Sequence, residues 1–147
     1  MRGVVHFELL PNNKTINTEV YCEQLDRLRI ALATKRPAIV NRKGVLFHQD
    51  NARPHKSKDT IEKITSFAWA LMAHPPYSPD IAPSDYYLFR SLEHFLRGKS
   101  FGNREAIESA LTDFFASKPP AFYRKGIECL PQRWEKVILN NGNYFVD

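Results

Sequence analysis

The sequence predicts an α/β fold that continues into a helical C-terminal part. Two short apolar runs, at residues 45–48 and 69–72, have the length of strands, and a helical pattern lies between them. Strand, helix and strand over this distance form a βαβ unit, so we expect the two strands to pair in parallel. After residue 84 the periodic segments carry apolar residues at helical spacings. A chain of 147 residues is long enough for one domain with a real core.

The first element is expected to be a strand over residues 4–9, because successive side chains alternate between an apolar and a more polar face. A turn follows at residues 11–13. The next segment predicts a helix that has Thr18 as its N-cap and ends before Pro37. Its buried face is expected to hold four residues at spacings of three and four: Tyr21, Leu25, Leu28 and Leu32.

The central βαβ unit begins with Val45–His48, which reads as apolar on both faces, as in a buried parallel sheet. A short helix is expected over Ser57–Ser66, with Ile61 and Ile64 pointing inward. Trp69–Met72 supplies the second strand.

The C-terminal part opens with residues 75–83, whose four prolines exclude a helix or a central strand. Ser84 is expected to cap the next helix, and Pro131 to split the last one. Helical patterns cover residues 85–97, 104–116 and 123–138.

The chain is mildly basic, with a formal net charge of +5 and a pI near 9.3. This charge is compatible with a polyanionic partner but does not identify one. No apolar stretch approaches the roughly 18–20 residues that a membrane span needs, so we expect no membrane partner. Cys22 and Cys129 have no metal-binding or redox spacing and are expected to be reduced core thiols.

Asp50 stands at the carboxyl end of the first strand of the βαβ unit. Ligands of open α/β sheets bind at that edge, which favours a functional carboxylate. The alternative is a turn or capping aspartate, because Asp50 and Asn51 shortly before Pro54 are favourable turn residues. The sequence alone leaves both interpretations open.

Asp85 precedes Leu88 and Phe89 by three and four residues, so it shares the helix face that is expected to turn toward the core. A carboxylate there is costly unless a cation meets it, and Mg²⁺ or Mn²⁺ prefers carboxylate oxygens. The alternative is a favourable position at the positive end of the helix dipole. Asp80 is a second candidate, but prolines surround it, and we interpret it as a turn residue.

Basic, histidine and tyrosine side chains surround both aspartates. The basic residues are either a solvated helix face or groups that neutralise phosphates: Arg53, Lys56 and Lys58. The histidines lack zinc-site spacing and are interpreted as polar groups that support the site or face DNA: His48, His55 and His74. The tyrosines are expected to pack inside the protein: Tyr77, Tyr86 and Tyr87.

Two blocks of sequence resemble the two signature blocks of mariner-type transposases, in the Tc1/mariner group. They are residues 48–55 (HQDNARPH) and 74–86 (HPPYSPDIAPSDY). The hallmark of that family is three catalytic aspartates, with 34 residues between the second and the third. The same number of residues separates Asp50 from Asp85, and the resemblance covers essentially the whole chain.

The resemblance implies an RNase H-like catalytic domain in which Asp50 and Asp85 are the second and third catalytic, metal-binding aspartates. It implies Mg²⁺ or Mn²⁺ as cofactor, DNA as partner and a nuclear location, and it makes a homodimer a further hypothesis. Residues 1–98 are expected to form part of the RNase H-like domain, and residues 99–147 a helical C-terminal extension of it. The expected DNA contacts are Arg53, His55, Lys56 and Lys58.

The first aspartate of the family, its first two strands and its DNA-reading helix-turn-helix modules find no match in these residues. We therefore expect an incomplete RNase H-like fold, a C-terminal fragment, and a chain that alone neither cleaves nor joins DNA. The alternative function is a noncatalytic remnant that binds DNA or dimerises. The chain is also similar to the transposase portion of SETMAR fusion proteins, but no segment resembles a SET domain, so histone methyl transfer is not expected.

Overall fold

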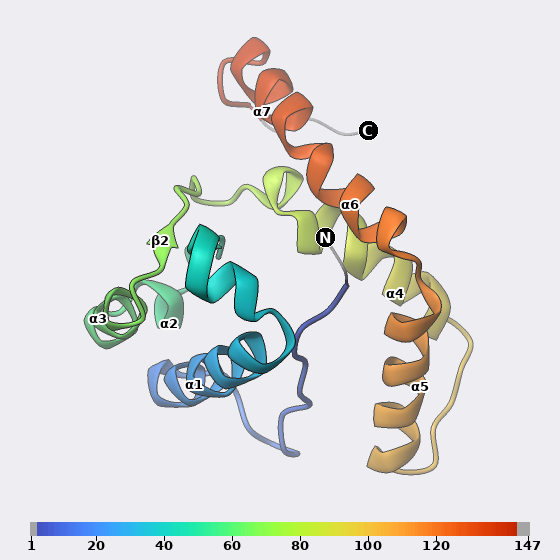
Figure 1. The fold of residues 1–147 in the computed structure, drawn as a ribbon. Helices are drawn as coiled ribbons and strands as arrows, with labels where there is room; N and C mark the ends of the chain where they lie inside the picture. The colour runs from blue at the N-terminus through green and yellow to red at the C-terminus, as the bar shows by residue number, and fades with distance from the viewer. Residues whose placement is uncertain (1–2, 144–147) are drawn as a thin grey trace. The chain divides into compact units, whose positions relative to one another are not determined.

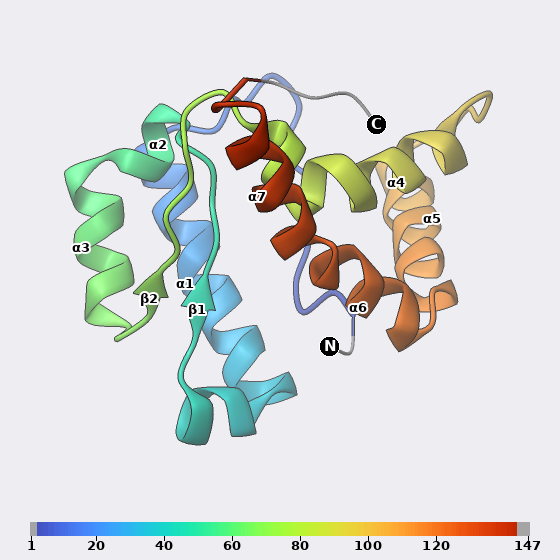
Figure 2. The same cartoon turned by 90° about the horizontal axis from the view of Figure 1, so that it is seen from above.

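Residues 3–143 are described by the structure, a computed structural model, with the side chain of Lys43 excepted. Helices dominate this part of the chain (Figures 1 and 2). The α-helices are α1 (Thr18–Lys35), α2 (Arg53–Lys56), α3 (Lys58–Ser66), α4 (Phe89–Leu96), α5 (Arg104–Ser117), α6 (Pro120–Glu128) and α7 (Leu130–Leu139). The strands are β1 (Leu46–Phe47) and β2 (Ala70–Leu71). Two π-helical turns, η1 (Ile39–Lys43) and η3 (Ser84–Leu88), and a 3-10 turn, η2 (Pro79–Ile81), complete the elements.

These elements fall into two compact units. Residues 5–77 form the first, which we call the strand unit because it holds β1 and β2. Residues 78 onward, together with Gly3 and Val4, form the second, which we call the helical unit. The predicted division at residue 98 stays a prediction.

The strand unit contains the predicted βαβ arrangement. β1 and β2 are parallel, with Leu46 opposite Ala70 and Phe47 opposite Leu71. Helix α3 connects them and packs against both β2 and α1 (Figure 2). The parallel pair and its crossover helix are therefore confirmed. The core of this unit has four buried side chains, Leu25, Leu32, Ile64 and Trp69, with partly buried neighbours that include Tyr21, Leu28, Val45 and Phe47.

Helix α1 buries the face that the sequence predicts, but its N-cap is Asn17 rather than Thr18. The Asn17 Oδ1 atom accepts a hydrogen bond from Val20 N at 2.8 Å, and the Asn17 backbone is extended. An N-cap side chain must reach an amide of the first turn, and Asn17 does so one residue earlier than expected.

The prediction that both faces of the first strand are buried is wrong. Val45 and Phe47 contact the core, whereas Leu46 is 65% exposed. Successive side chains of a strand point to opposite faces, and the core of this unit lies on the face of Val45 and Phe47. Ile61 of α3 is exposed as well, although it was expected to point inward with Ile64.

The predicted strand over residues 4–9 is also wrong, since the structure has no strand there. Side chains hold this segment against α1 instead. Arg27 donates to both carboxylate oxygens of Glu8, at 2.8 and 2.7 Å, and the Lys35 ammonium donates to the carbonyl of Val5 at 2.7 Å. An alternating sequence pattern indicates which side chains are buried. A strand also needs backbone hydrogen bonds to a neighbouring strand.

The Glu8–Arg27 pair should make the stability of the strand unit depend on pH. The hydrogen bonds from Arg27 lower the pKa of Glu8 from 4.5 to about 2, against the opposing effect of partial burial. A carboxyl group whose pKa is lower in the folded protein stabilises the fold at any pH above its pKa in the unfolded chain. This contribution to stability is lost as the pH falls through the pKa of the folded protein. We expect Glu8→Gln to flatten the decline in unfolding free energy between pH 4.5 and pH 2, measured by urea denaturation.

The matched control is Glu62→Gln, which removes an exposed ion pair with Lys58 on α3. Exposed pairs contribute little to stability, so this variant should keep the wild-type pH profile. A Glu8→Gln profile parallel to that of the wild type over the same pH range would contradict the assignment.

The helical unit confirms most of the predicted C-terminal helices. Leu111 and Phe114 of α5 are buried, and the Phe114 ring lies 4.9 Å from that of Phe95 on α4. The last helical pattern is split as expected, because α6 ends at Glu128 and Pro131 lies in the first turn of α7. Figure 2 shows α6 leading directly into α7.

The helix predicted for residues 85–97 begins differently from the expectation. Ser84 is the first residue of the π-helical turn η3 rather than a cap, because Pro83 holds the N-cap position, and η3 leads into α4. Phe89 is exposed rather than inward, because the wider turn shifts the register of the following residues. Helix α4 ends at Leu96 with Arg97 as its C-cap, and Gly98 follows with a positive φ of 73°, a common glycine conformation after a helix.

Cys22 and Cys129 are both free and only half-buried, so neither occupies the core position that the sequence predicted. Across residues 3–143, none of the helices combines the length and the hydrophobicity that a bilayer crossing requires.

Candidate functional site

Asp50 lies three residues after β1 and presents a carboxylate whose side chain is 51% exposed. Its Oδ1 atom accepts hydrogen bonds from Ala52 N at 2.9 Å and from the His55 ring, through Nδ1, at 2.5 Å. The first of these is the turn interaction that the sequence suggested. Neither bond uses Oδ2, so this oxygen can serve a ligand while Oδ1 holds the turn.

The His55 ring that meets Asp50 is itself held by α1 and by the residue before Asp50. Tyr21 of α1 lies against it, with 4.1 Å between the ring centroids. The Tyr21 hydroxyl donates to Gln49 Oε1 at 2.7 Å, and Gln49 Nε2 donates to the carbonyl of His55 at 2.9 Å. Tyr21 thus packs against the His55 ring, while Gln49 holds the His55 backbone.

The surroundings of Asp50 favour its ionised form. Partial burial opposes ionisation, but the hydrogen bonds from Ala52 N and His55 and the electrostatic effect of His55 and His74 together hold the pKa of Asp50 below its usual value. An ionised, partly exposed carboxylate with one unengaged oxygen is a suitable donor for a hard cation.

Two further bonds join the chain after β1 to the chain after β2. Asn51 Nδ2 donates to the carbonyl of His74 at 2.6 Å, and the rings of His48 and His74 are linked from Nε2 to Nδ1 at 2.9 Å. Burial and the nearby His74 lower the pKa of His48. The structure therefore bonds His55 directly to Asp50, whereas His48 bonds to His74 and His74 to Asn51, the residue after Asp50.

The predicted basic residues follow Asp50 on α2 and α3. Arg53 and Lys56 are exposed on the four-residue helix α2. Lys58 is exposed at the start of α3 and lies 3.6 Å from the carboxylate of Glu62. Arg53 and Lys56 thus lie closer to Asp50 in the chain than Lys58, whose charge is partly balanced.

Asp85 belongs to the helical unit, where it is the second residue of η3. Its side chain is half-buried, and its backbone N–H donates to the carbonyl of Ala82 at 2.9 Å. π-helical turns occur mostly as single turns and often at functional sites. Asp80 is buried in η2, and its carbonyl accepts a hydrogen bond from Arg133 at 2.9 Å.

Sequence reasoning missed the residues that surround the segment after Asp85. Tyr86 is buried, its hydroxyl donates to the carbonyl of Gly126 at 2.5 Å, and the Arg133 guanidinium lies 3.9 Å from the centre of its ring. Burial raises the pKa of Tyr86 to about 12. One signal was available, because a glycine inside a helix is unfavourable unless packing requires it. Tyr77, by contrast, is 99% exposed, so its predicted packing is wrong.

The chemistry of these donors suits Mg²⁺ or Mn²⁺, but only in part. Asp50 and Asp85 each offer a carboxylate, the donor type that hard cations prefer. Within residues 3–143, no three His, Cys, Asp or Glu side chains come together as a metal site. The two aspartates are thus candidate ligands rather than a complete site.

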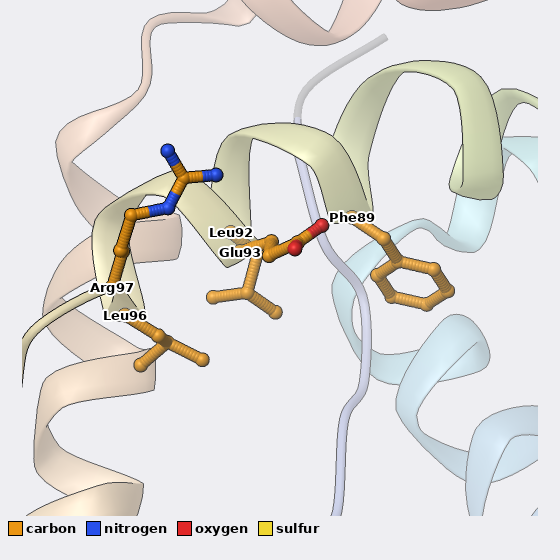
Figure 3. A pocket seen from close by; sticks show the side chains of 5 residues that line it. All are labelled: Phe89, Leu92, Glu93, Leu96 and Arg97. Atoms are coloured by element: carbon orange, nitrogen blue, oxygen red, sulfur yellow. The ribbon is translucent and has the colours of Figure 1, made fainter.

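A shallow hollow along one face of α4 is not a better candidate. It is lined by Phe89, Leu92, Glu93 and Leu96 of this helix and by Arg97, the residue that follows it (Figure 3). Its lining is mainly apolar, and Glu93 is its only carboxylate.

Comparisons with known proteins all indicate the same family. A family model described as "Transposase (partial DDE domain)" matches residues 1–42. The Mariner Mos1 transposase of Drosophila mauritiana is 41% identical over 143 residues, which are 97% of this chain and 41% of that protein. The human protein named histone-lysine N-methyltransferase SETMAR is 39% identical over 143 residues, which are 97% of this chain and 21% of that protein. The chain thus spans less than half the length of these two relatives.

Solved structures of the Mos1 transposase match more completely. A Mos1 catalytic domain with Mg is 40% identical with a TM-score of 0.95, and the match covers 99% of this chain and 73% of that one. A Mos1 paired end complex with Mn is 39% identical with a TM-score of 0.94, over 99% of this chain and 42% of that one. These matches support the α/β fold and the RNase H-like relationship. The chain belongs to the mariner family of transposases.

Proposed function

We propose that this chain is part of a mariner-type DNA transposase whose metal-dependent DNA cleavage and strand transfer use Asp50 and Asp85. The observation that carries the proposal is Asp50, an ionised carboxylate with one unengaged oxygen at the carboxyl end of β1. It lies in one of the two family blocks, and Asp85 lies in the other at the family's separation.

The fold is proposed to be an incomplete RNase H-like domain. In this proposal β1 and β2 are two strands of a larger sheet, and its first two strands lie outside these 147 residues. The helices after residue 98 form the C-terminal extension of the same domain. Two observations support this: the chain spans 73% of a Mos1 catalytic domain, and Leu46 of β1 is left exposed.

The proposed cofactor is Mg²⁺ or Mn²⁺, the ions named with the Mos1 catalytic domain. An ion held at either aspartate would supply Lewis acidity toward phosphate oxygens and a more acidic bound water. The Asp50 side chain would contribute Oδ2, while the hydrogen bonds from Ala52 and His55 hold Oδ1. Cleavage by the 147-residue chain alone is not expected, because only two of the family's three aspartates, Asp50 and Asp85, find a match in it.

The proposed macromolecular partner is DNA, reached in the nucleus. One related structure is named as Mos1 with the left transposon end. Arg53 and Lys56 are exposed beside Asp50, where they could neutralise phosphates next to a bound ion. Lys58 and His55 are weaker candidates, because Lys58 faces Glu62 and His55 turns one nitrogen to Asp50.

A noncatalytic remnant that binds DNA or forms a homodimer is the second candidate. The exposed apolar residues Leu46 and Leu71 on β1 and β2 favour this alternative, because they give the small sheet an uncovered surface. Under this alternative the chain would bind DNA or itself without needing an ion at either aspartate. A methyltransferase function gains no support from the match to SETMAR, because the chain covers only 21% of that protein.

Titration of the ¹⁵N-labelled chain with Mn²⁺ tests the first candidate. A bound paramagnetic ion broadens the amide signals closest to it, so each aspartate reports its own occupancy. We expect selective broadening around Asp50 and around Asp85, removed locally by Asp50→Asn and by Asp85→Asn. Loss of one carboxylate charge should weaken local binding about tenfold or more, because hard cations depend on charged oxygen ligands.

Asp59→Asn is the matched control, since Asp59 is an exposed aspartate in the first turn of α3. It should leave the broadening at both candidate ligands unchanged. Uniform broadening that neither Asp50→Asn nor Asp85→Asn alters would refute the metal-dependent function and leave the noncatalytic alternative.

A further inference from the structure

The residues directly after Asp85 are held by helices that follow much later in the chain. Asp85 is followed by Tyr86 and Tyr87 within the π-helical turn η3, and both tyrosines contact α6 or α7. All of these contacts lie inside the helical unit.

Tyr86 is fixed at both its hydroxyl and its ring. The hydroxyl donates to the carbonyl of Gly126, in α6, at 2.5 Å. The ring is covered by the Arg133 guanidinium of α7, 3.9 Å from its centre. A buried tyrosine with a bonded hydroxyl and a covered ring has few alternative rotamers, so the backbone of η3 is held close to one position.

Tyr87 packs against the same residue of α6, Gly126. A Cβ atom on Gly126 would lie 2.4 Å from Tyr87 Cδ1, so the ring occupies space that only a glycine leaves open. The Tyr87 ring also packs against Phe122 of α6, with 4.9 Å between the centroids. Gly126 therefore contacts both tyrosines. Its carbonyl accepts the hydrogen bond from Tyr86, and the Tyr87 ring packs beside its Cα.

The segment before Asp85 is anchored by the same arginine. Arg133 Nη1 donates to the carbonyl of Asp80 at 2.9 Å while its plane covers Tyr86. One guanidinium thus joins η2 and η3, the turns on either side of residues 82–83. Arginine is suited to this double role because its planar guanidinium donates hydrogen bonds within its plane and stacks on an aromatic ring with its face.

We propose that Tyr86, Gly126 and Arg133 are positioning residues that set the orientation of the Asp85 carboxylate. This inference rests on the proposed function, in which Asp85 is a metal ligand. The C-terminal helices α6 and α7 then act on the metal site through the backbone of η3. Groups that orient a metal ligand commonly change metal affinity about 10- to 100-fold when removed.

The test compares Tyr86→Phe with Tyr123→Phe in the Mn²⁺ titration of the labelled chain. Tyr123 is a matched control, because its hydroxyl also donates to a backbone carbonyl, that of Phe115, at 2.6 Å. It joins α6 to α5 rather than to η3. We expect Tyr86→Phe to weaken binding at Asp85 about three- to tenfold, less than removal of a directly bonded partner would. Binding at Asp50 in the same sample should not change.

A second variant, Arg133→Lys, keeps the charge but loses the planar stack and should weaken binding at Asp85 as well. Wild-type affinity at Asp85 in Tyr86→Phe and Arg133→Lys would overturn the positioning role, as would an equal loss in Tyr123→Phe. If instead Asp85→Asn leaves the broadening near residue 85 intact, it is the proposed function that fails.

Discussion

Replacing Leu25 by alanine is expected to lower the free energy of unfolding by about 2–5 kcal/mol. Leu25 lies on the inner face of α1 and is only 2% exposed. It belongs to the core cluster with Leu32, Ile64 and Trp69, which joins α1 to α3 and to the start of β2. Truncation removes buried methyl groups and leaves a cavity that these neighbours fill only in part. Because α1 also carries Tyr21, the variant should loosen the support of His55 as well.

Urea denaturation followed by tryptophan fluorescence measures this effect, since Trp69 is part of the same core. Ile30→Ala is the matched control on α1, because Ile30 is 60% exposed. It should change the unfolding free energy by no more than about 0.5 kcal/mol. Equal losses in the two variants would mean that the core assigned to the strand unit is wrong.

Replacing Gly126 by alanine is expected to destabilise the helical unit by about 1–3 kcal/mol. The new Cβ would lie 2.4 Å from Tyr87 Cδ1 and 2.9 Å from Cε1, so the ring must move. Movement is restricted, because Phe122 lies against the same ring. Alanine is otherwise favoured over glycine inside a helix by about 1 kcal/mol. A net loss of stability would therefore report the steric conflict directly.

Gly102→Ala provides the matched control, because nothing lies within 4 Å of the position of its Cβ. Thermal denaturation should show a lower Tm for Gly126→Ala and little change for Gly102→Ala. Combining Gly126→Ala with Tyr87→Leu should recover part of the loss, since the smaller side chain removes the clash. A Tm for Gly126→Ala at or above that of the wild type would contradict the close packing of η3 on α6.

The elements predicted correctly from the sequence are those governed by local periodicity. The parallel pair of β1 and β2, the buried face of α1 and the break at Pro131 all follow from patterns inside one short stretch of the chain each. The errors arose where a distant partner decides the outcome. Residues 4–9 have the pattern of a strand, but side chains from α1 hold them instead.

The candidate site shows the same division. Asp50 was predicted from its place after a strand, and its turn hydrogen bond to Ala52 is equally local. The hydrogen bond from Tyr21 to Gln49 spans 28 positions and has no local pattern, so sequence reasoning could not find it. Asp85 was predicted from its separation from Asp50, which equals the separation in the family. The contacts that surround Asp85 in η3 became visible only in the structure.

The contacts around η3 join residues that are far apart in the sequence, and this has a consequence for synthesis on the ribosome. The bond from Tyr86 to Gly126 spans 40 positions, and the bond from Arg133 to Asp80 spans 53. The turn that carries Asp85 therefore leaves the exit tunnel well before the helices that anchor it. Contacts between distant positions form late, since the intervening chain must first be closed into a loop. A nascent chain that stalls before α7 holds Asp85 but not the guanidinium that joins its two flanking turns.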